Sequence, residues 1–187
     1  MRTAVFLDRD GTINEEMGYI NHPDRFRLLP NSAAAIARLN QAGLLVVVAT
    51  NQSGMARGYF PSSLISQIHS LMRQLLAQQK AQLDAIYVCQ HAPDADCLCR
   101  KPNPGLLHQA ARDLDIDLTR SYVVGDRFKD IQLAANVGAK GILVLTGYGR
   151  GELEYYEGER LVEPHYIATD LFDAAAWILK DMGKGSG

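Results

Sequence analysis

Short apolar runs alternate along the chain with segments in which apolar residues recur at helical spacing. The runs have the length of strands and lie at 4–7, 44–50, 85–89, 122–125 and 141–146, with a short one near 166–169. They are apolar throughout rather than at every second position, which is typical of parallel strands buried on both faces of a sheet. We therefore expect a mostly parallel sheet that is covered by helices on both sides.

The segments between these runs predict helices at 32–42, after 61–63, at 104–114, at 128–138 and at 171–182. In the second of them, apolar residues from Leu64 to Leu76 fall on one face. Asn31 is expected to cap the first helix and Gly43 to end it. Strands that alternate with helices indicate a doubly wound, Rossmann-like α/β fold with three α/β/α layers.

The length of 187 residues suits a single domain, which we place at 1–182. The Gly-rich end at 183–187 is predicted to be a flexible tail, and the polar stretch at 149–160 a surface loop. A net charge of −2 without a basic block argues against nucleic acid or a membrane as a partner. The sequence has neither an apolar run of roughly 18 residues nor a signal-peptide pattern. We expect a monomeric, cytoplasmic protein.

Polar residues follow four of the predicted apolar stretches, at the edge of the sheet where ligands bind in this fold class. Carboxylates gathered there could not all stay ionised without a cation among them. Oxygen ligands of this kind suit Mg²⁺, and Mg²⁺ together with lysine and threonine makes a receptor for a phosphoryl group. The residues concerned are Asp8, Asp10, Thr50, Asn51, Arg100, Lys101, Asp126, Arg127 and Asp130.

In order and spacing, four of these stretches resemble the motifs of the haloacid dehalogenase superfamily of phosphatases. They are "DRDGT" at 8–12, Thr50 after a strand, Lys101 before a proline, and "GDRFKD" at 125–130. Any one match alone is more typical of an ordinary turn, cap or surface residue, so the inference depends on finding all four in order.

The resemblance implies Asp8 as a nucleophile that forms an aspartyl phosphate, and Asp10 as the general acid and then the general base. It implies that Thr50 and Lys101 hold the phosphoryl oxygens. It also implies Mg²⁺ bound by Asp8, the backbone carbonyl of Asp10 and Asp126, with Asp130 orienting a metal-bound water or Lys101.

Three cysteines and a histidine fall within eleven residues. One residue separates Cys89 from His91, five residues follow, and one residue separates Cys97 from Cys99. This spacing matches a tetrahedral zinc site with no open position. Such a zinc ion would be structural and would hold the next residues of the chain, Arg100 and Lys101, over the phosphate. The alternative is a set of reduced cysteines beside a surface histidine.

This cysteine loop is similar to one shared by two families that lack a large cap domain, the D-glycero-D-manno-heptose 1,7-bisphosphate 7-phosphatases and the histidinol-phosphate phosphatases. "TNQSGMARG" at 50–58 and "RKPNPG" at 100–105 favour the heptose type, whereas Arg127 after Asp126 also resembles the histidinol type. The resemblance implies a small phosphorylated sugar as substrate, a precursor of the lipopolysaccharide core. Asn51 and Gln52 would then bind sugar hydroxyls, and a second phosphate would be bound by Arg57, Arg100 and Arg127.

Two other classes of function remain open at this point. A non-enzymatic phosphoacceptor signalling domain also places acidic residues, threonine and lysine around Mg²⁺, but it has no need of Asp10. A zinc-dependent hydrolase would use the cysteine loop in catalysis, which requires a zinc ion with an open position.

Overall fold

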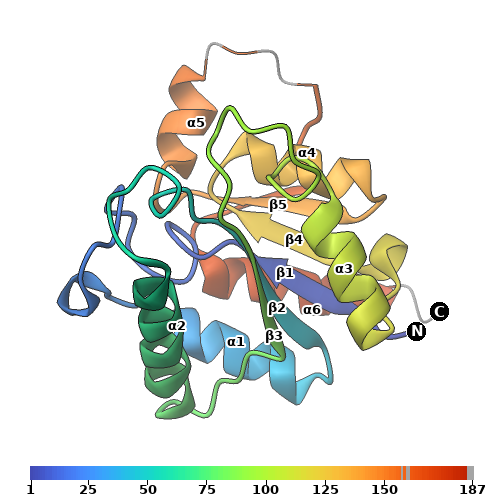
Figure 1. Cartoon of the computed structure of the whole chain (residues 1–187). Helices are drawn as coiled ribbons and strands as arrows, with labels where there is room; N and C mark the ends of the chain where they lie inside the picture. Colours follow the sequence, from blue (N-terminus) through green and yellow to red (C-terminus); the bar gives the residue numbers. More distant parts are fainter. Residues whose placement is uncertain (157, 159–160, 185–187) are drawn as a thin grey trace.

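The computed structural model describes residues 1–156, 158 and 161–184. In this part of the chain, six parallel strands form one sheet in the order β3-β2-β1-β4-β5-β6 (Figure 1). The predicted parallel sheet is thereby confirmed. The strands are β1 (Ala4–Leu7), β2 (Leu45–Asn51), β3 (Ala85–Cys89), β4 (Tyr122–Gly125), β5 (Lys140–Val144) and β6 (Tyr166–Ala168).

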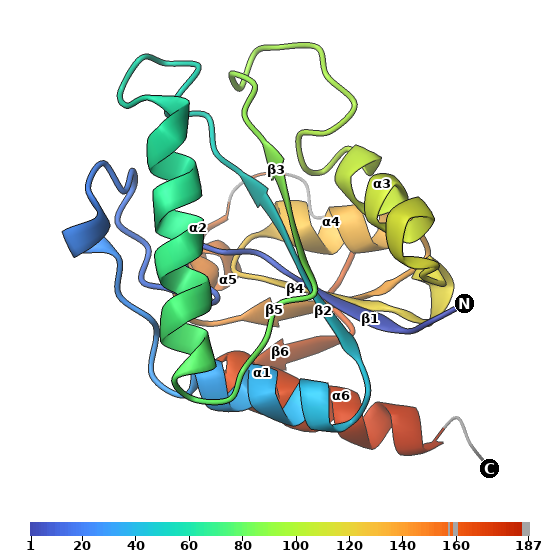
Figure 2. The same ribbon diagram turned by 60° about the horizontal axis from the view of Figure 1, so that its bottom comes forward.

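Helices cover both faces of this sheet, as Figure 2 shows, so the three predicted layers are present. On one face lie α1 (Ser32–Gln41), α2 (Ser62–Ala77) and α6 (Leu171–Lys184). The other face is covered by α3 (Gly105–Leu114) and α4 (Phe128–Asn136). A shorter helix, α5 (Gly149–Tyr155), follows β5, and 3-10 turns η1 (Pro23–Arg25) and η2 (Leu118–Arg120) precede α1 and β4.

The central strand β1 shows why the strands are apolar at every position. Val5 and Leu7 pack toward α1, α2 and α6, whereas Ala4 and Phe6 pack toward α3 and α4. All four are fully buried. A strand with a solvated face would alternate apolar and polar residues, and β1 has no such face.

Several local predictions differ from the structure. Asn31 does not cap α1 through its side chain; it takes a left-handed conformation at φ 62°, which asparagine tolerates. The stretch predicted as a surface loop, 149–160, is helical as far as Tyr155. Helix α6 includes Gly183 and Lys184, which the sequence had assigned to the tail. The rest of that tail, 185–187, and residues 157 and 159–160 lie outside the described part of the chain.

Over the described ranges, the segments between the four motifs hold the helices of the α/β layers and no large cap domain. Within the same residues, every helix is too short or too polar to span a membrane.

Candidate active site

The carboxyl ends of β1, β2 and β4, together with the loop before α3, enclose a cavity of about 250 Å³. Most of the residues predicted from the sequence line it: Asp8, Asp10, Thr50, Asn51, Gln52, Arg100, Lys101, Asp126, Arg127 and Asp130. Arg57 does not belong to this lining and is exposed on the loop between β2 and α2. The lining also includes residues that the sequence analysis did not single out, among them Glu16, Tyr19, Lys129 and Tyr148.

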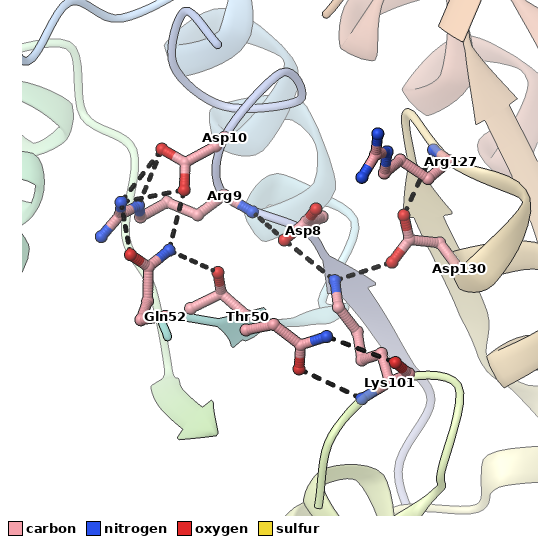
Figure 3. A network of polar contacts seen from close by, with 9 residues as sticks. Asp8, Arg9, Asp10, Thr50, Gln52, Lys101, Arg127 and Asp130 are labelled. Atoms are coloured by element: carbon pink, nitrogen blue, oxygen red, sulfur yellow. Dashed lines mark hydrogen bonds and ion pairs between the residues drawn. The ribbon is translucent and has the colours of Figure 1, made fainter. Parts of the chain in front are cut away.

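Lys101 links the first and last acidic motifs (Figure 3). Its Nζ lies 2.9 Å from Oδ1 of Asp8 and 2.7 Å from Oδ1 of Asp130, and its side chain is 5% exposed. Burial by itself would lower the pKa of Lys101, but the charges of Asp130 and Asp8 outweigh burial and raise it. The ammonium group therefore stays charged at the centre of the site.

Asn51, at the end of β2, holds the loop that carries Lys101. The backbone N–H of Lys101 donates to Oδ1 of Asn51 at 3.1 Å, and Nδ2 of Asn51 donates to the carbonyl of Lys101 at 3.3 Å. The amide predicted to bind a sugar hydroxyl is thus already engaged in positioning Lys101.

Asp8, Asp126 and Asp130 bring carboxylate oxygens to within 4.8 Å of one another. Burial raises the pKa of Asp126 to about 8, with further contributions from Asp8 and Asp130. Burial also raises the pKa of Asp8 to about 6, although Lys101 opposes the shift. A cation among these oxygens would relieve the repulsion, and a set of carboxylate oxygens fits Mg²⁺.

Two glycines make room for the Asp126 carboxylate. Gly11, at φ +78°, and Gly147, at φ +54°, lie so close to it that a β carbon on either would collide with its oxygen. The backbone N–H of Tyr148 donates to the same carboxylate at 2.8 Å. The "DGT" turn after β1 and the turn after β5 therefore close around Asp126.

Asp10 lies apart from this cluster, in contact with the side chain of Arg9 (Figure 3). Nη2 of Arg9 donates to the two Asp10 oxygens at 3.0 and 2.9 Å. Nδ2 of Asn14 donates to Asp10 at 2.9 Å, and Nε2 of Gln52 donates to Asp10 at 2.8 Å. These contacts hold the Asp10 carboxylate in a fixed orientation.

Arg9 is a site residue that the sequence analysis missed. It is 2% exposed, and its Nη2 also donates to Oε1 of Gln52 at 3.0 Å. Its Nη1 lies 3.2 Å from Nε2 of His69 on α2. Burial and the charge of Arg9 lower the pKa of His69 to about 4, so the neutral imidazole can accept from Arg9 near pH 7. The sequence signal for Arg9 is its place between Asp8 and Asp10, just after a buried strand.

Thr50 belongs to the same hydrogen-bond network. Its Oγ1 accepts from Nε2 of Gln52 at 3.0 Å, which leaves the hydroxyl hydrogen available to a ligand. The amide of Gln52 therefore connects Thr50 with Asp10 and Arg9, rather than pointing freely into the cavity.

The cations at the mouth of the cavity differ in how they are held. Nη1 of Arg100 donates to the carbonyl of His91 at 3.3 Å, so Arg100 is tied to the cysteine loop. The Arg127 guanidinium lies over the ring of Tyr148, with its carbon 4.1 Å from the ring centroid.

Cys89, His91, Cys97 and Cys99 form a second group with metal-ligand geometry, in which the potential ligand atoms lie within 4.8 Å of one another. Sγ of Cys97 lies 3.8 Å from those of Cys89 and Cys99, and Nδ1 of His91 lies 3.1 Å from Sγ of Cys99. Burial and the neighbouring thiols raise the pKa of Cys99 to about 12. Three thiols and an imidazole this close together fit a tetrahedral Zn²⁺ ion, which would stabilise the thiolates.

Comparison with known proteins relates this chain to phosphatases. Residues 98–174 match the HAD-hydrolase-like family. A D-glycero-D-manno-heptose-1,7-bisphosphate 7-phosphatase from Thermosynechococcus vestitus is 44% identical, over 95% of this chain and 95% of that protein. A D-glycero-beta-D-manno-heptose-1,7-bisphosphate 7-phosphatase from Bordetella bronchiseptica is 45% identical, over 85% of this chain and 91% of that protein.

Among solved structures, the B. bronchiseptica D,D-heptose 1,7-bisphosphate phosphatase, complexed with magnesium and phosphate, superposes with a TM-score of 0.88. It is 43% identical in sequence, and the match covers 97% of this chain and 99% of that one. The D,D-heptose 1,7-bisphosphate phosphatase from Burkholderia thailandensis gives a TM-score of 0.72 at 35% identity, covering 95% of this chain and 99% of that one.

The raised pKa values of Asp126 and Asp8 predict how the magnesium-free protein responds to pH. Because these carboxyls bind protons more tightly in the folded than in the unfolded chain, stability should fall as the pH rises from about 4 to 8. Asp126→Asn removes one of these groups and should raise the melting temperature of the magnesium-free protein at pH 8.

Thermal melts of both proteins, with and without MgCl₂, test this prediction. Mg²⁺ should raise the melting temperature of the wild type and leave that of Asp126→Asn unchanged. An equal response of the two proteins to Mg²⁺ would show that Asp126 is not a ligand.

Proposed function

The chain belongs to the D-glycero-D-manno-heptose-1,7-bisphosphate 7-phosphatase family of haloacid dehalogenase-like hydrolases, and we propose that it removes the 7-phosphate of this sugar through an aspartyl phosphate. The structural observation that carries the proposal is the buried Lys101, which touches Asp8 beside a cluster of three carboxylates. The relatives of this chain are phosphatases, which argues against the alternative of a non-enzymatic signalling domain.

In the first proposed step, an oxygen of Asp8 attacks the phosphorus atom of the substrate. The bond between phosphorus and the sugar oxygen breaks as the aspartyl phosphate forms. Asp10 donates a proton to the departing sugar oxygen. Lys101 and Thr50 donate hydrogen bonds to the phosphoryl oxygens and stabilise their charge.

In the second step, water attacks the phosphorus atom of the aspartyl phosphate. Asp10, now a carboxylate, accepts the proton of that water. The bond to Asp8 breaks, which releases inorganic phosphate and returns Asp8 to its initial state. Arg9, Asn14 and Gln52 would orient Asp10 for both proton transfers.

Two metals accompany this proposal. Mg²⁺ would be held by Asp8, the backbone carbonyl of Asp10 and Asp126, where it would neutralise charge on the phosphoryl oxygens; the B. bronchiseptica relative is complexed with this ion. Asp130, at 2.7 Å from Lys101, would orient that lysine. A structural Zn²⁺ ion would be held by Cys89, His91, Cys97 and Cys99.

The substrate's second phosphate would meet the cations at the mouth of the cavity. Arg100, Arg127 and Lys129 line that mouth, and guanidinium groups match phosphate oxygens well. Arg57 lies outside the lining, so the structure lends it less support than Arg100 and Arg127.

Replacing Asp10 tests its role as the proton carrier. Asp10→Asn keeps an acceptor for Arg9 but cannot transfer the proton, so kcat should fall by at least about 10²-fold. Asp24→Asn, a change of the same kind at an exposed carboxylate, is the control and should leave kcat unchanged. Steady-state phosphate release measures both variants, and unchanged turnover by folded Asp10→Asn would refute the assignment.

Phosphate release from a panel of substrates tests the proposed substrate. The panel comprises both anomers of D-glycero-D-manno-heptose 1,7-bisphosphate, histidinol phosphate and common hexose phosphates. We expect kcat/KM for one heptose bisphosphate anomer to exceed that for histidinol phosphate by at least about 10²-fold, because several polar contacts discriminate between them. Efficient hydrolysis of histidinol phosphate with poor heptose turnover would reverse the choice of substrate.

The two metals should be separable by experiment. Metal analysis should find about one zinc ion per wild-type chain and much less in Cys97→Ser, whose melting temperature should also fall. Removing Mg²⁺ alone should abolish turnover and leave the zinc content unchanged. Turnover supported by zinc without magnesium would contradict this division of roles and favour a zinc-dependent hydrolase.

A further inference from the structure

We propose that helix α5 positions Arg127 to bind the phosphate that the enzyme does not cleave, acting through Glu152 and Tyr148. The inference rests on the proposed function, because it requires a substrate with two phosphates. It assigns a role to α5 (Gly149–Tyr155), which lies in a stretch that the sequence predicts as a surface loop.

The Arg127 side chain is held at two points along its length. Its guanidinium carbon lies 4.1 Å from the centroid of the Tyr148 ring, and its Nε forms an ion pair at 3.4 Å with Oε1 of Glu152. The second contact is electrostatic, because Nε forms no hydrogen bond within the described residues. The Arg127 side chain is 42% exposed, whereas that of Glu152 is 14% exposed, so the acidic partner is the better buried of the two. Arginine is long and flexible, and these contacts restrict where its charged end can lie.

Within the described part of the chain, no residue forms a hydrogen bond with Nη1 or Nη2 of Arg127, and Arg127 lines the cavity that contains Asp8. As far as these residues are concerned, the terminal amines are open to a ligand. Figure 3 shows its side chain extending from the backbone toward the side of the site on which Asp8 lies. A guanidinium group with free amines can donate two parallel hydrogen bonds to one phosphate.

The two residues that hold Arg127 are themselves anchored to the catalytic motifs. Oε2 of Glu152 accepts from the backbone N–H of Phe128, at the start of α4, at 2.8 Å. The backbone N–H of Tyr148 donates to Asp126 at 2.8 Å. These contacts fix the distance between the Arg127 guanidinium and the carboxylate cluster, and so favour a substrate whose two phosphates have the matching separation.

An ion pair with a partly exposed arginine contributes little to stability. The effect of Glu152 should therefore appear in substrate binding. The chain supplies a matched control, because Glu154 lies on the same helix and pairs at 3.9 Å with the exposed Arg150, away from the cavity.

The experiment compares heptose 1,7-bisphosphate with heptose 7-phosphate, which lacks the second phosphate. Glu152→Gln should raise KM for the bisphosphate by about 3–10-fold, with kcat little changed, and leave KM for the monophosphate unaltered. Arg127→Gln should produce the same selective change, larger in size. Glu154→Gln should change neither substrate's KM.

A double-mutant cycle separates positioning from a general structural effect. If Glu152 acts through Arg127, Glu152→Gln should add no further rise in KM when Arg127 is already glutamine. Arg127→Lys supplies a second test if Glu152→Gln fails to fold: it keeps the charge but loses the planar group over Tyr148, and should also raise KM for the bisphosphate alone.

The outcomes distinguish this inference from the proposed function. A wild type that hydrolyses neither heptose phosphate would overturn both. A wild type that prefers the bisphosphate, with Glu152→Gln equal to Glu154→Gln or with equal losses on both substrates, would overturn the role of α5 and leave the proposed function intact.

Discussion

A buried ammonium group between two carboxylates is the interaction on which the rest of the site depends. Lys101 contacts Asp8 after β1 and Asp130 on α4, which belong to the first and the last of the four motifs. Removing the lysine would leave two carboxylates without their cation in a buried place, a change that typically costs about 3–5 kcal/mol. Its position is in turn set by Asn51, so three segments of the chain must be correctly placed before any one of them can act.

The parallel sheet explains how such distant segments meet. β1 lies between β2 and β4, and all three strands end at the same edge, so the residues that follow them become neighbours. The cysteine loop follows β3 at the same edge and leads directly into Arg100 and Lys101. A metal bound there would therefore stiffen the approach to the phosphate site while remaining outside the chemistry.

The sequence predicts the buried strands and the residues at the strand ends, because both stand at fixed places in this fold. Strand bounds were correct to within two residues, because fully buried strands are apolar at every position, and the residues at their ends followed from the topology. It did not predict Arg9, whose partner His69 is 60 residues away on α2. It also does not predict α5, whose residues are mostly polar and give no apolar helical pattern. This helix is held instead by contacts such as that of Glu152 with the start of α4. Asn51 and Gln52 line the cavity, but what their amides bind depends on side-chain geometry that spacing does not reveal.

The place of β1 at the centre of the sheet also constrains how the protein is made. β1, which leads into Asp8, is synthesised well before one of its two neighbours, β4, which begins only at Tyr122. Until then one edge of an entirely apolar strand has no partner, which exposes it to aggregation and slows folding through contacts distant in sequence. Because β1 pairs with β4, the edge of the sheet that carries Asp8 and Asp126 is complete only after this late pairing has formed.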